Sequence, residues 1–280
     1  MKAVAYFGNW DIYGANYFIT DVPAENLTHL VYVFANVNTT TGSVILSDTW
    51  ADLQYAYPGD NTTAPGENVC GNIKQMFLLK KKHRHLKTML SIDHSQAAQM
   101  VDLLKRLRQS LDQLAEKTDH DPVSRFLHCY GFGLHGTRIQ QLLWLLVKLV
   151  PGCPQSTCNY YDTNSSLDFY MFNGRVPPNK IVLENPLYGR VFNGTNGVGD
   201  KFSNGGTQGS LAALKAEYVQ CLGLAGTAWW EVSMDRNDTL SLIGTTVSLF
   251  GGAGALDQSL HNLNYPTSTY VNLKDGFSGN

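Results

Sequence analysis

The sequence has little net charge and no long hydrophobic run. Lys and Arg total 21 against 23 Asp and Glu, which leaves a formal net charge of −2 at pH 7. That balance provides no basic field for nucleic acid or for an acidic membrane surface. The longest apolar stretch, residues 142–150, contains Lys148 and is far shorter than the ~20 residues that span a bilayer. We therefore expect neither nucleic acid nor a membrane as a partner.

Regular cysteine spacing, a metal-ligand pattern and a leader segment are also missing. The five cysteines are odd in number and irregularly spaced, so they predict no disulfide framework. Several side chains suggest a zinc site but match no recognised ligand spacing: His128, Cys129, His135, Cys153 and Cys158. We expect no metal and no cofactor. Residues 1–10 form a strand pattern, and not the apolar core of a signal peptide.

Asn, Thr and aromatic residues are plentiful. Six Asn-x-Ser/Thr sequons permit N-glycosylation if the chain is secreted, although several arise by chance in such a composition: Asn26, Asn38, Asn61, Asn164, Asn193 and Asn237. The 14 Tyr, 12 Phe and 5 Trp are typical of proteins that stack sugars on ring faces, and equally of a well-filled core. Composition alone leaves both interpretations open.

Strand patterns alternate with helix patterns along much of the chain. The expected strands are residues 2–10, 29–37, 88–92, 179–190 and 226–235, and the main expected helices are 69–85, 97–114, 165–173, 210–222 and 241–250. Residues 38–68 are expected to form a long polar loop. A basic run at residues 80–85 is expected to be a solvated last helical turn, with an anion site as the alternative. The alternation predicts one α/β domain with a parallel sheet or barrel.

Five stretches resemble the glycoside hydrolases of family 18, and most closely the fungal chitinases of that family. In the family's order they are AVAYFGNWDIYG, NLTHLVYVFANV, IKQMFLLKKKHRHLKTMLSI, NKIVLENPLYGRVF and LKAEYVQCLGLAGTAWWEVSMDRNDTLSLIGT. The resemblance implies a (β/α)8 TIM barrel with its site at the carboxyl ends of the strands. It also implies retaining hydrolysis of the β-1,4 links between N-acetylglucosamine units of chitin, with the substrate's N-acetyl group as nucleophile.

The residues that would perform this hydrolysis are missing from the chain. The family's general acid is the last Glu of an Asp-Gly-x-Asp-x-Asp-x-Glu strand, and no such series occurs here. Asp93-His94 follow the third strand where the family continues with Gly-Gly-Trp, and the family's Met-x-Tyr-Asp strand is also absent. We assign no catalytic residue. Glu184 and Glu231 are the carboxylates considered as replacements, and we expect both to be structural or loop-anchoring groups.

The losses predict one incomplete barrel domain over residues 1–280. Strands near the middle of the barrel and most of the small insertion domain are expected to be missing, and residues 123–158 carry no family resemblance. Family positions that contact sugar do survive. The resemblance implies substrate binding by Tyr6, Trp10, Phe34, Tyr188, Arg190 and Trp230.

Three interpretations of function follow. The first is a protein of the chitinase family whose catalysis is lost. The second is a catalytically silent binder of chitin or chito-oligosaccharides. The third is a mis-assembled gene product that does not fold. The family implies an extracellular location, whereas the missing signal segment also allows an intracellular one, and the oligomeric state stays open.

Overall fold

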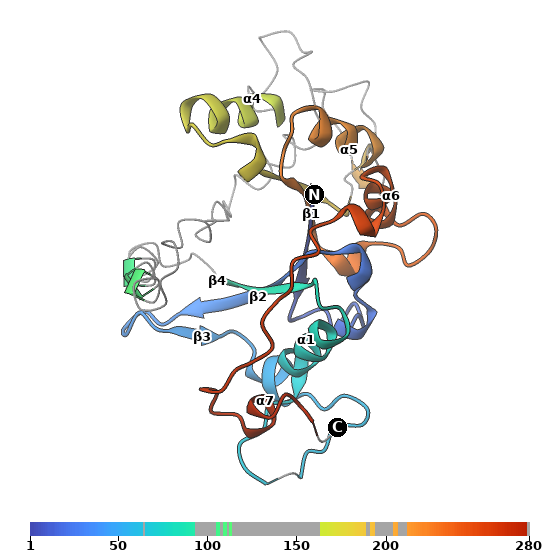
Figure 1. The fold of residues 1–280 in the computed structure, drawn as a ribbon. Helices are drawn as coiled ribbons and strands as arrows, with labels where there is room; N and C mark the ends of the chain where they lie inside the picture. The colour runs from blue at the N-terminus through green and yellow to red at the C-terminus, as the bar shows by residue number, and fades with distance from the viewer. Residues whose placement is uncertain are drawn as a thin grey trace.

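The computed structural model describes residues 1–63, 65–92, 105–106, 109–110, 112–113, 163–188, 191–193, 204–206 and 212–278 (Figure 1). The expected helix at 97–114 lies almost wholly outside these residues. So does the segment 123–158 that carries no family resemblance. None of the described helices is both long enough and apolar enough to cross a bilayer.

Five parallel strands form the main sheet. They are β1 (Lys2–Gly8), β2 (His29–Val37), β4 (Lys87–Ile92), β5 (Val182–Pro186) and β8 (Gly226–Trp230). Their order across the sheet is β4-β2-β1-β8-β5. This is the order of the third, second, first, eighth and seventh strands of a (β/α)8 barrel. Within the described residues no strand joins β4 to β5, so the sheet is a partial barrel, as the missing segments predict.

The burial of the side chains agrees with the central position of β1 and β2 in this strand order. β1 and β2 are buried on both faces for most of their length, as expected for central parallel strands covered on both sides. One face packs against the helices through residues such as Phe7, Leu30 and Trp229. The opposite, concave face carries Val4, Val31 and Ala228. Side chains of adjacent residues therefore enter two different apolar clusters.

The helices lie mainly on the outer face of the sheet. They are α1 (Gly71–Lys82), α4 (Thr163–Asp168), α5 (Ala212–Cys221) and α6 (Leu242–Leu249), with the short α7 (Val271–Lys274) near the end of the chain. Five described segments form single turns of 3-10 helix around them, and two more, Trp50–Gln54 and Phe169–Asn173, are π-helical. A small antiparallel pair, β6 (Val191–Asn193) and β7 (Asn204–Gly206), stands where the family has its insertion domain. The Gly-rich stretch there thus holds a hairpin that the sequence patterns do not predict.

Two expectations for the region before β4 are wrong. Residues 38–68 are not a structureless loop, since they contain β3 (Val44–Leu46), antiparallel to β2, and the π-helical turn Trp50–Gln54. Nor is the basic run fully solvated. Lys80 is 3% exposed and its Nζ donates to the Tyr265 hydroxyl at 2.5 Å. Burial and the nearby Arg84 charge lower the pKa of Lys80 to about 8. The run anchors the C-terminal segment.

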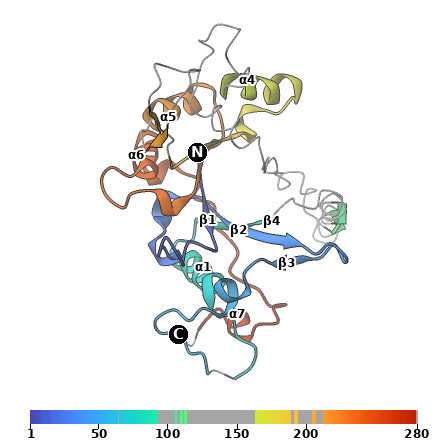
Figure 2. The same cartoon turned by 180° about the vertical axis from the view of Figure 1, so that it is seen from behind.

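The contact between α1 and the C-terminal segment closes the fold on itself. The rings of Phe77 and Phe277 lie 5.0 Å apart, and both side chains are buried. The backbone N–H of Val69 donates to the Asn272 side chain at 3.0 Å. Both views show α1 and α7 side by side, although about 200 residues separate them in sequence (Figures 1 and 2). The ends of the chain therefore belong to one packed unit.

The two neighbouring tryptophans of β8 provide a test of this packing. Trp229 is 2% exposed and lies in the outer core, so Trp229→Ala should lower the free energy of unfolding by about 3–5 kcal/mol. Trp230 lies half-buried on the concave face, and Trp230→Ala should cost clearly less. Urea denaturation followed by circular dichroism measures both. Equal losses, or a wild-type chain without a cooperative transition, would contradict the packing described here.

Candidate functional site

Four aromatic side chains gather on the concave face at the carboxyl ends of β1, β2 and β8. We call Tyr6, Trp10, Phe34 and Trp230 the aromatic platform. Trp230 is its centre, because its ring lies 5.1 Å from Tyr6, 5.9 Å from Phe34 and 6.5 Å from Trp10 (centroid distances). Trp10 and Phe34 are 5.8 Å apart. The three strands that supply these rings are paired directly, so the sheet register sets their spacing.

The backbone beside Trp10 allows its indole to reach the platform. A Cβ atom on Gly8 would lie 2.4 Å from the Trp10 ring, closer than any packed side chain tolerates. Glycine at position 8 is therefore required for this ring to fold back over the end of β1. With 42% of its surface exposed, Trp10 forms the outer edge of the platform, and Tyr6 at 8% forms its buried base.

Hydrogen bonds tie the loops around the platform together. Asn9 donates from Nδ2 to the Ser47 hydroxyl at 2.8 Å, and Ser47 donates to the carbonyl of Phe34 at 2.5 Å. Asn9 also donates to buried Asp52, which accepts a second bond from the hydroxyl of Tyr32. The segments before Trp10 and at Phe34 are thus fixed by the same polar network. A ring surface held in this way loses little conformational entropy when a ligand stacks on it.

The remaining predicted site residues lie in the turn after β5. The N–H of Leu187 donates to the carbonyl of Trp230 at 2.8 Å, so this turn begins beside the platform. Tyr188 follows it and is half-buried. Arg190 lies outside the described residues. The structure thus brings four of the six predicted residues into ring contact and places a fifth in an adjoining turn.

A buried pair of carboxyl groups lies directly behind the platform. Asp11 follows Trp10 and is 1% exposed, and Glu231 follows Trp230 and is 2% exposed. Burial, a hydrogen bond to Glu231 and its charge raise the pKa of Asp11 to about 8, while the N–H of Gly8 donates to Asp11 at 2.9 Å and opposes the rise. At neutral pH the pair therefore shares a proton, because two adjacent buried carboxylates repel each other.

Glu231 is held in a structural position. Its Oε1 accepts a bond from the hydroxyl of Ser233 at 2.6 Å and its Oε2 accepts one from the N–H of the same residue at 3.2 Å, which caps the turn Val232–Met234. Together with Asp11 these bonds occupy the carboxyl group below the surface. Glu231 therefore presents no acid to a ligand lying on the platform.

Glu184 has a different environment. Its side chain lies on the concave face of β5 and is accessible to solvent. The surrounding protein nevertheless reduces the hydration of the carboxyl group, which raises the pKa of Glu184 to about 7. That value suits a general acid. The position of Glu184 in the sheet does not suit a general acid at the platform, since Glu184 pairs with Ala228 whereas Trp230 pairs with Pro186. Because a strand rises about 3.3 Å per residue, the backbone of Glu184 lies about 6–7 Å farther from the carboxyl end of the sheet than that of Trp230.

The arrangement can therefore bind a flat apolar face, while Asp11 and Glu231 are buried and Glu184 lies one side-chain row deeper in the sheet than Trp230. Among the described residues no cluster of His, Cys, Asp or Glu has the makings of a metal site. The five residues considered for a zinc site, for which we expected no metal, lie outside the described residues. Sequence reasoning did not single out Asp11 or Asn9. The one available signal was position, because each acid of the buried pair directly follows a platform tryptophan.

Comparisons with known proteins agree with this arrangement. Residues 2–99 match the profile of the glycosyl hydrolases of family 18. Endochitinase 1 of Metarhizium robertsii is 29% identical over 382 aligned positions, covering 96% of this chain and 89% of that protein. Since the alignment is longer than the 280 residues of this chain, the fungal protein has segments without a counterpart here.

Solved structures share the fold. The catalytic domain of the psychrophilic chitinase B from Arthrobacter TAD20 superposes with a TM-score of 0.65 at 17% identity, covering 93% of this chain and 97% of that domain. Human YKL-39, described as a pseudo-chitinase with retained chitooligosaccharide binding properties, gives 0.55 at 14% identity, covering 92% and 98%. At these identities the likeness concerns the fold, which is that of the barrel domain of chitinases.

The shared proton of the buried pair has a consequence for stability. Folding raises the Asp11 pKa from its ordinary value near 4, so the folded chain binds this proton more tightly than the unfolded chain does. The stabilisation is complete below about pH 4 and is lost as the pH rises through about 8, at up to about 1.4 kcal/mol per pH unit. Asp11→Asn should remove this contribution to the slope, because the amide can donate to Glu231 without ionising.

The measurement is the free energy of unfolding between pH 7 and pH 9. Half-buried His29 and His261 do not interfere, since burial lowers the pKa of each to about 4 and both stay neutral in this range. Lys80, Lys215 and Glu184, with pKa values of about 8, 8 and 7, titrate alike in both proteins, so the difference between the two slopes isolates Asp11. Tyr17, which faces the same carboxyl groups, has a raised pKa and also stays neutral. Asp238→Asn is the matched control, because Asp238 is exposed and its pKa of about 2 keeps it ionised. Wild type and Asp11→Asn with the same slope would refute the shared proton.

Proposed function

Since the chain belongs to family 18 of the glycosyl hydrolases, as a protein of the fungal chitinase type, we propose that it binds chitin or chito-oligosaccharides without hydrolysing them. One observation carries the proposal: the stacking rings of the site are assembled in contact with one another, while Asp11 and Glu231 are buried and Glu184 lies one side-chain row deeper in the sheet. An aromatic side chain buries about 150–250 Å² in a core or an interface. An indole ring can therefore cover much of the apolar face of a sugar ring. Catalysis, in contrast, needs an acid within about 3 Å of the leaving oxygen.

The proposed site consists of the aromatic platform with Tyr188 and Arg190 at its edge. Trp230 would form the floor under one sugar, Tyr6 and Phe34 its flanks, and Trp10 a further stacking position. The exposed fraction of Trp10 supports this order, since it is the ring most open to a ligand. The human protein YKL-39 is a precedent for binding without hydrolysis on the same fold. We also propose an extracellular location, where chitin would be met.

A hydrolase that uses Glu184 as a relocated acid is the second candidate. The observation in its favour is the pKa of about 7, which would keep a large fraction of this carboxyl protonated at neutral pH. The position of Glu184 in β5, one side-chain row deeper in the sheet than Trp230, argues against this second candidate. A single activity measurement separates the two candidates.

Binding is tested first with chitotetraose and purified full-length chain, by titration calorimetry. Trp230→Ala should weaken binding about tenfold or more, because truncating a central aromatic commonly costs about 2 kcal/mol. Phe172→Ala is the matched control, since Phe172 is 73% exposed and makes no ring contact with the platform. Undiminished binding by a folded Trp230→Ala variant would exclude the platform as the site.

Hydrolysis is tested with fluorogenic chitobiose and chitotriose substrates. We expect the wild type, Glu184→Gln and Glu231→Gln to release fluorophore at the same background rate, because none places an acid at the platform. Wild-type turnover that Glu184→Gln alone abolishes would identify Glu184 as the acid and overturn the loss of catalysis. Turnover that survives both substitutions would point to a group outside the described residues and overturn it as well.

A further inference from the structure

The sequons whose side chains the structure describes differ in how far those side chains are committed to the fold. Asn164 lies in α4, where its Nδ2 donates to Asp168 at 2.9 Å and its Oδ1 accepts from the Tyr218 hydroxyl at 2.8 Å. Asn38 and Asn61 accept backbone N–H groups of their own turns. The Asn237 amide is exposed and makes no side-chain hydrogen bond to the described residues. Asn26 makes no such bond either, but it is half-buried, so Asn237 is the most accessible uncommitted sequon among those whose side chains the structure describes.

The loop that presents Asn237 is held rigidly by its neighbours. Asp235 accepts the hydroxyl of Ser241 at 2.7 Å and the N–H of Leu242 at 2.8 Å, which fixes the start of α6. Asp238 accepts the N–H of Leu240 at 2.9 Å and pairs with Arg236. These bonds shape the turn on both sides of Asn237 without using its side chain. A group attached there would leave every one of them intact.

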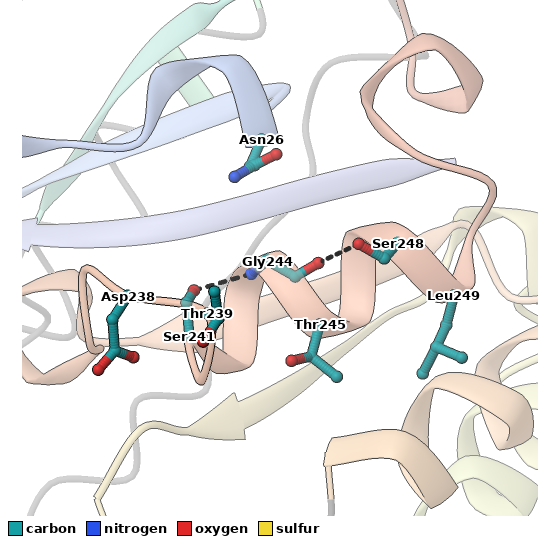
Figure 3. A pocket seen from close by; sticks show the side chains of 8 residues that line it. All are labelled: Asn26, Asp238, Thr239, Ser241, Gly244, Thr245, Ser248 and Leu249. Atoms are coloured by element: carbon teal, nitrogen blue, oxygen red, sulfur yellow. Dashed lines mark hydrogen bonds between the residues drawn. The ribbon is translucent and has the colours of Figure 1, made fainter.

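A groove begins at this sequon and follows α6. It has a volume of about 570 Å³ and runs from Asp238 and Thr239 past Thr245 to Ser248, with Asn26 on its opposite side (Figure 3). Its volume lies in the ~300–1,000 Å³ range of small-molecule sites. Most of the lining side chains carry a hydroxyl or amide group beside apolar carbon surface, and the Asn26 amide makes no side-chain hydrogen bond within the described residues. Leu249 adds an apolar contact at the far end.

We propose that Asn237 carries an N-linked glycan and that the first sugars of this glycan lie in the groove along α6. A sugar has hydroxyl groups for Thr239, Ser248 and Asn26, and apolar ring faces for Leu249. In the attachment step the Asn237 Nδ2 forms a bond to C1 of an oligosaccharide carried on a lipid diphosphate. The bond from C1 to the diphosphate oxygen breaks, the amide gives up one proton, and the lipid diphosphate leaves. The inference rests on the proposed extracellular route and is independent of chitin binding.

The attachment is tested by expressing the full chain in a secreting eukaryotic host. The purified protein is treated with peptide N-glycosidase in ¹⁸O water and the peptide containing residue 237 is analysed by mass spectrometry. Wild type and Thr239→Ser, which keeps the sequon, should both show Asn237 converted to labelled Asp. Thr239→Ala, which removes the sequon, should not. An unmodified Asn237 in the wild type, whether the chain is secreted or retained, would overturn the proposal.

The place of the glycan is tested with Thr245→Arg, which fills the groove and leaves the sequon untouched. Removing the glycan from the folded wild type should lower its thermal midpoint by a few degrees, because the sugar contacts are lost. The same treatment should leave the midpoint of Thr245→Arg unchanged at equal occupancy of Asn237. Equal shifts in both proteins would overturn the groove contact. Chitotetraose titration of the deglycosylated wild type separates these outcomes from the proposed function, which predicts that binding persists.

Discussion

The structure depends on the pairing of β1 with both β2 and β8. β1 lies at the centre of the sheet, and its residues from Ala3 to Phe7 are almost without exposed surface. Its pairing with β8 brings together segments more than 200 residues apart, at a loop-closure cost that grows only slowly with length. Because of that slow growth, segments can be lost between β4 and β5 while the strands on either side still meet. The register of these three strands then fixes the platform.

The buried carboxyl pair makes this junction sensitive to protons. Asp11 and Glu231 lie one residue beyond Trp10 and Trp230, on the two strand ends that build the site. Burying a charge without a partner is costly, and the pair reduces that cost by holding one proton between two acids. Each acid also has a local task, since Asp11 accepts the N–H of Gly8 and Glu231 caps the following turn. The stacking surface and its supporting hydrogen bonds are thus one unit.

The sequence predicted the strands and the platform better than the features beneath them. The bounds of β2 follow from its continuous apolar run, and Trp10, Phe34 and Trp230 follow from the family resemblance. The burial of Lys80 could not be predicted, because its partner Tyr265 is 185 residues away and no local pattern links the two. The same holds for Asp11 and Glu231, whose contact exists only once β1 and β8 are paired. β3 was missed because three residues give too short a period-two pattern to separate a strand from a loop.

Loss of segments affects catalysis and binding differently. General-acid catalysis depends on one carboxyl oxygen at one position, with a pKa tuned to the reaction, so losing the strand that carries it removes the chemistry entirely. Stacking depends on area shared among several rings, and here those rings come from strands that remain paired. Glu184 illustrates the difference, since it has a suitable pKa of about 7 but lies a full side-chain row below Trp230. On the proposed function, an incomplete barrel of this kind would therefore lose hydrolysis before it lost its stacking surface.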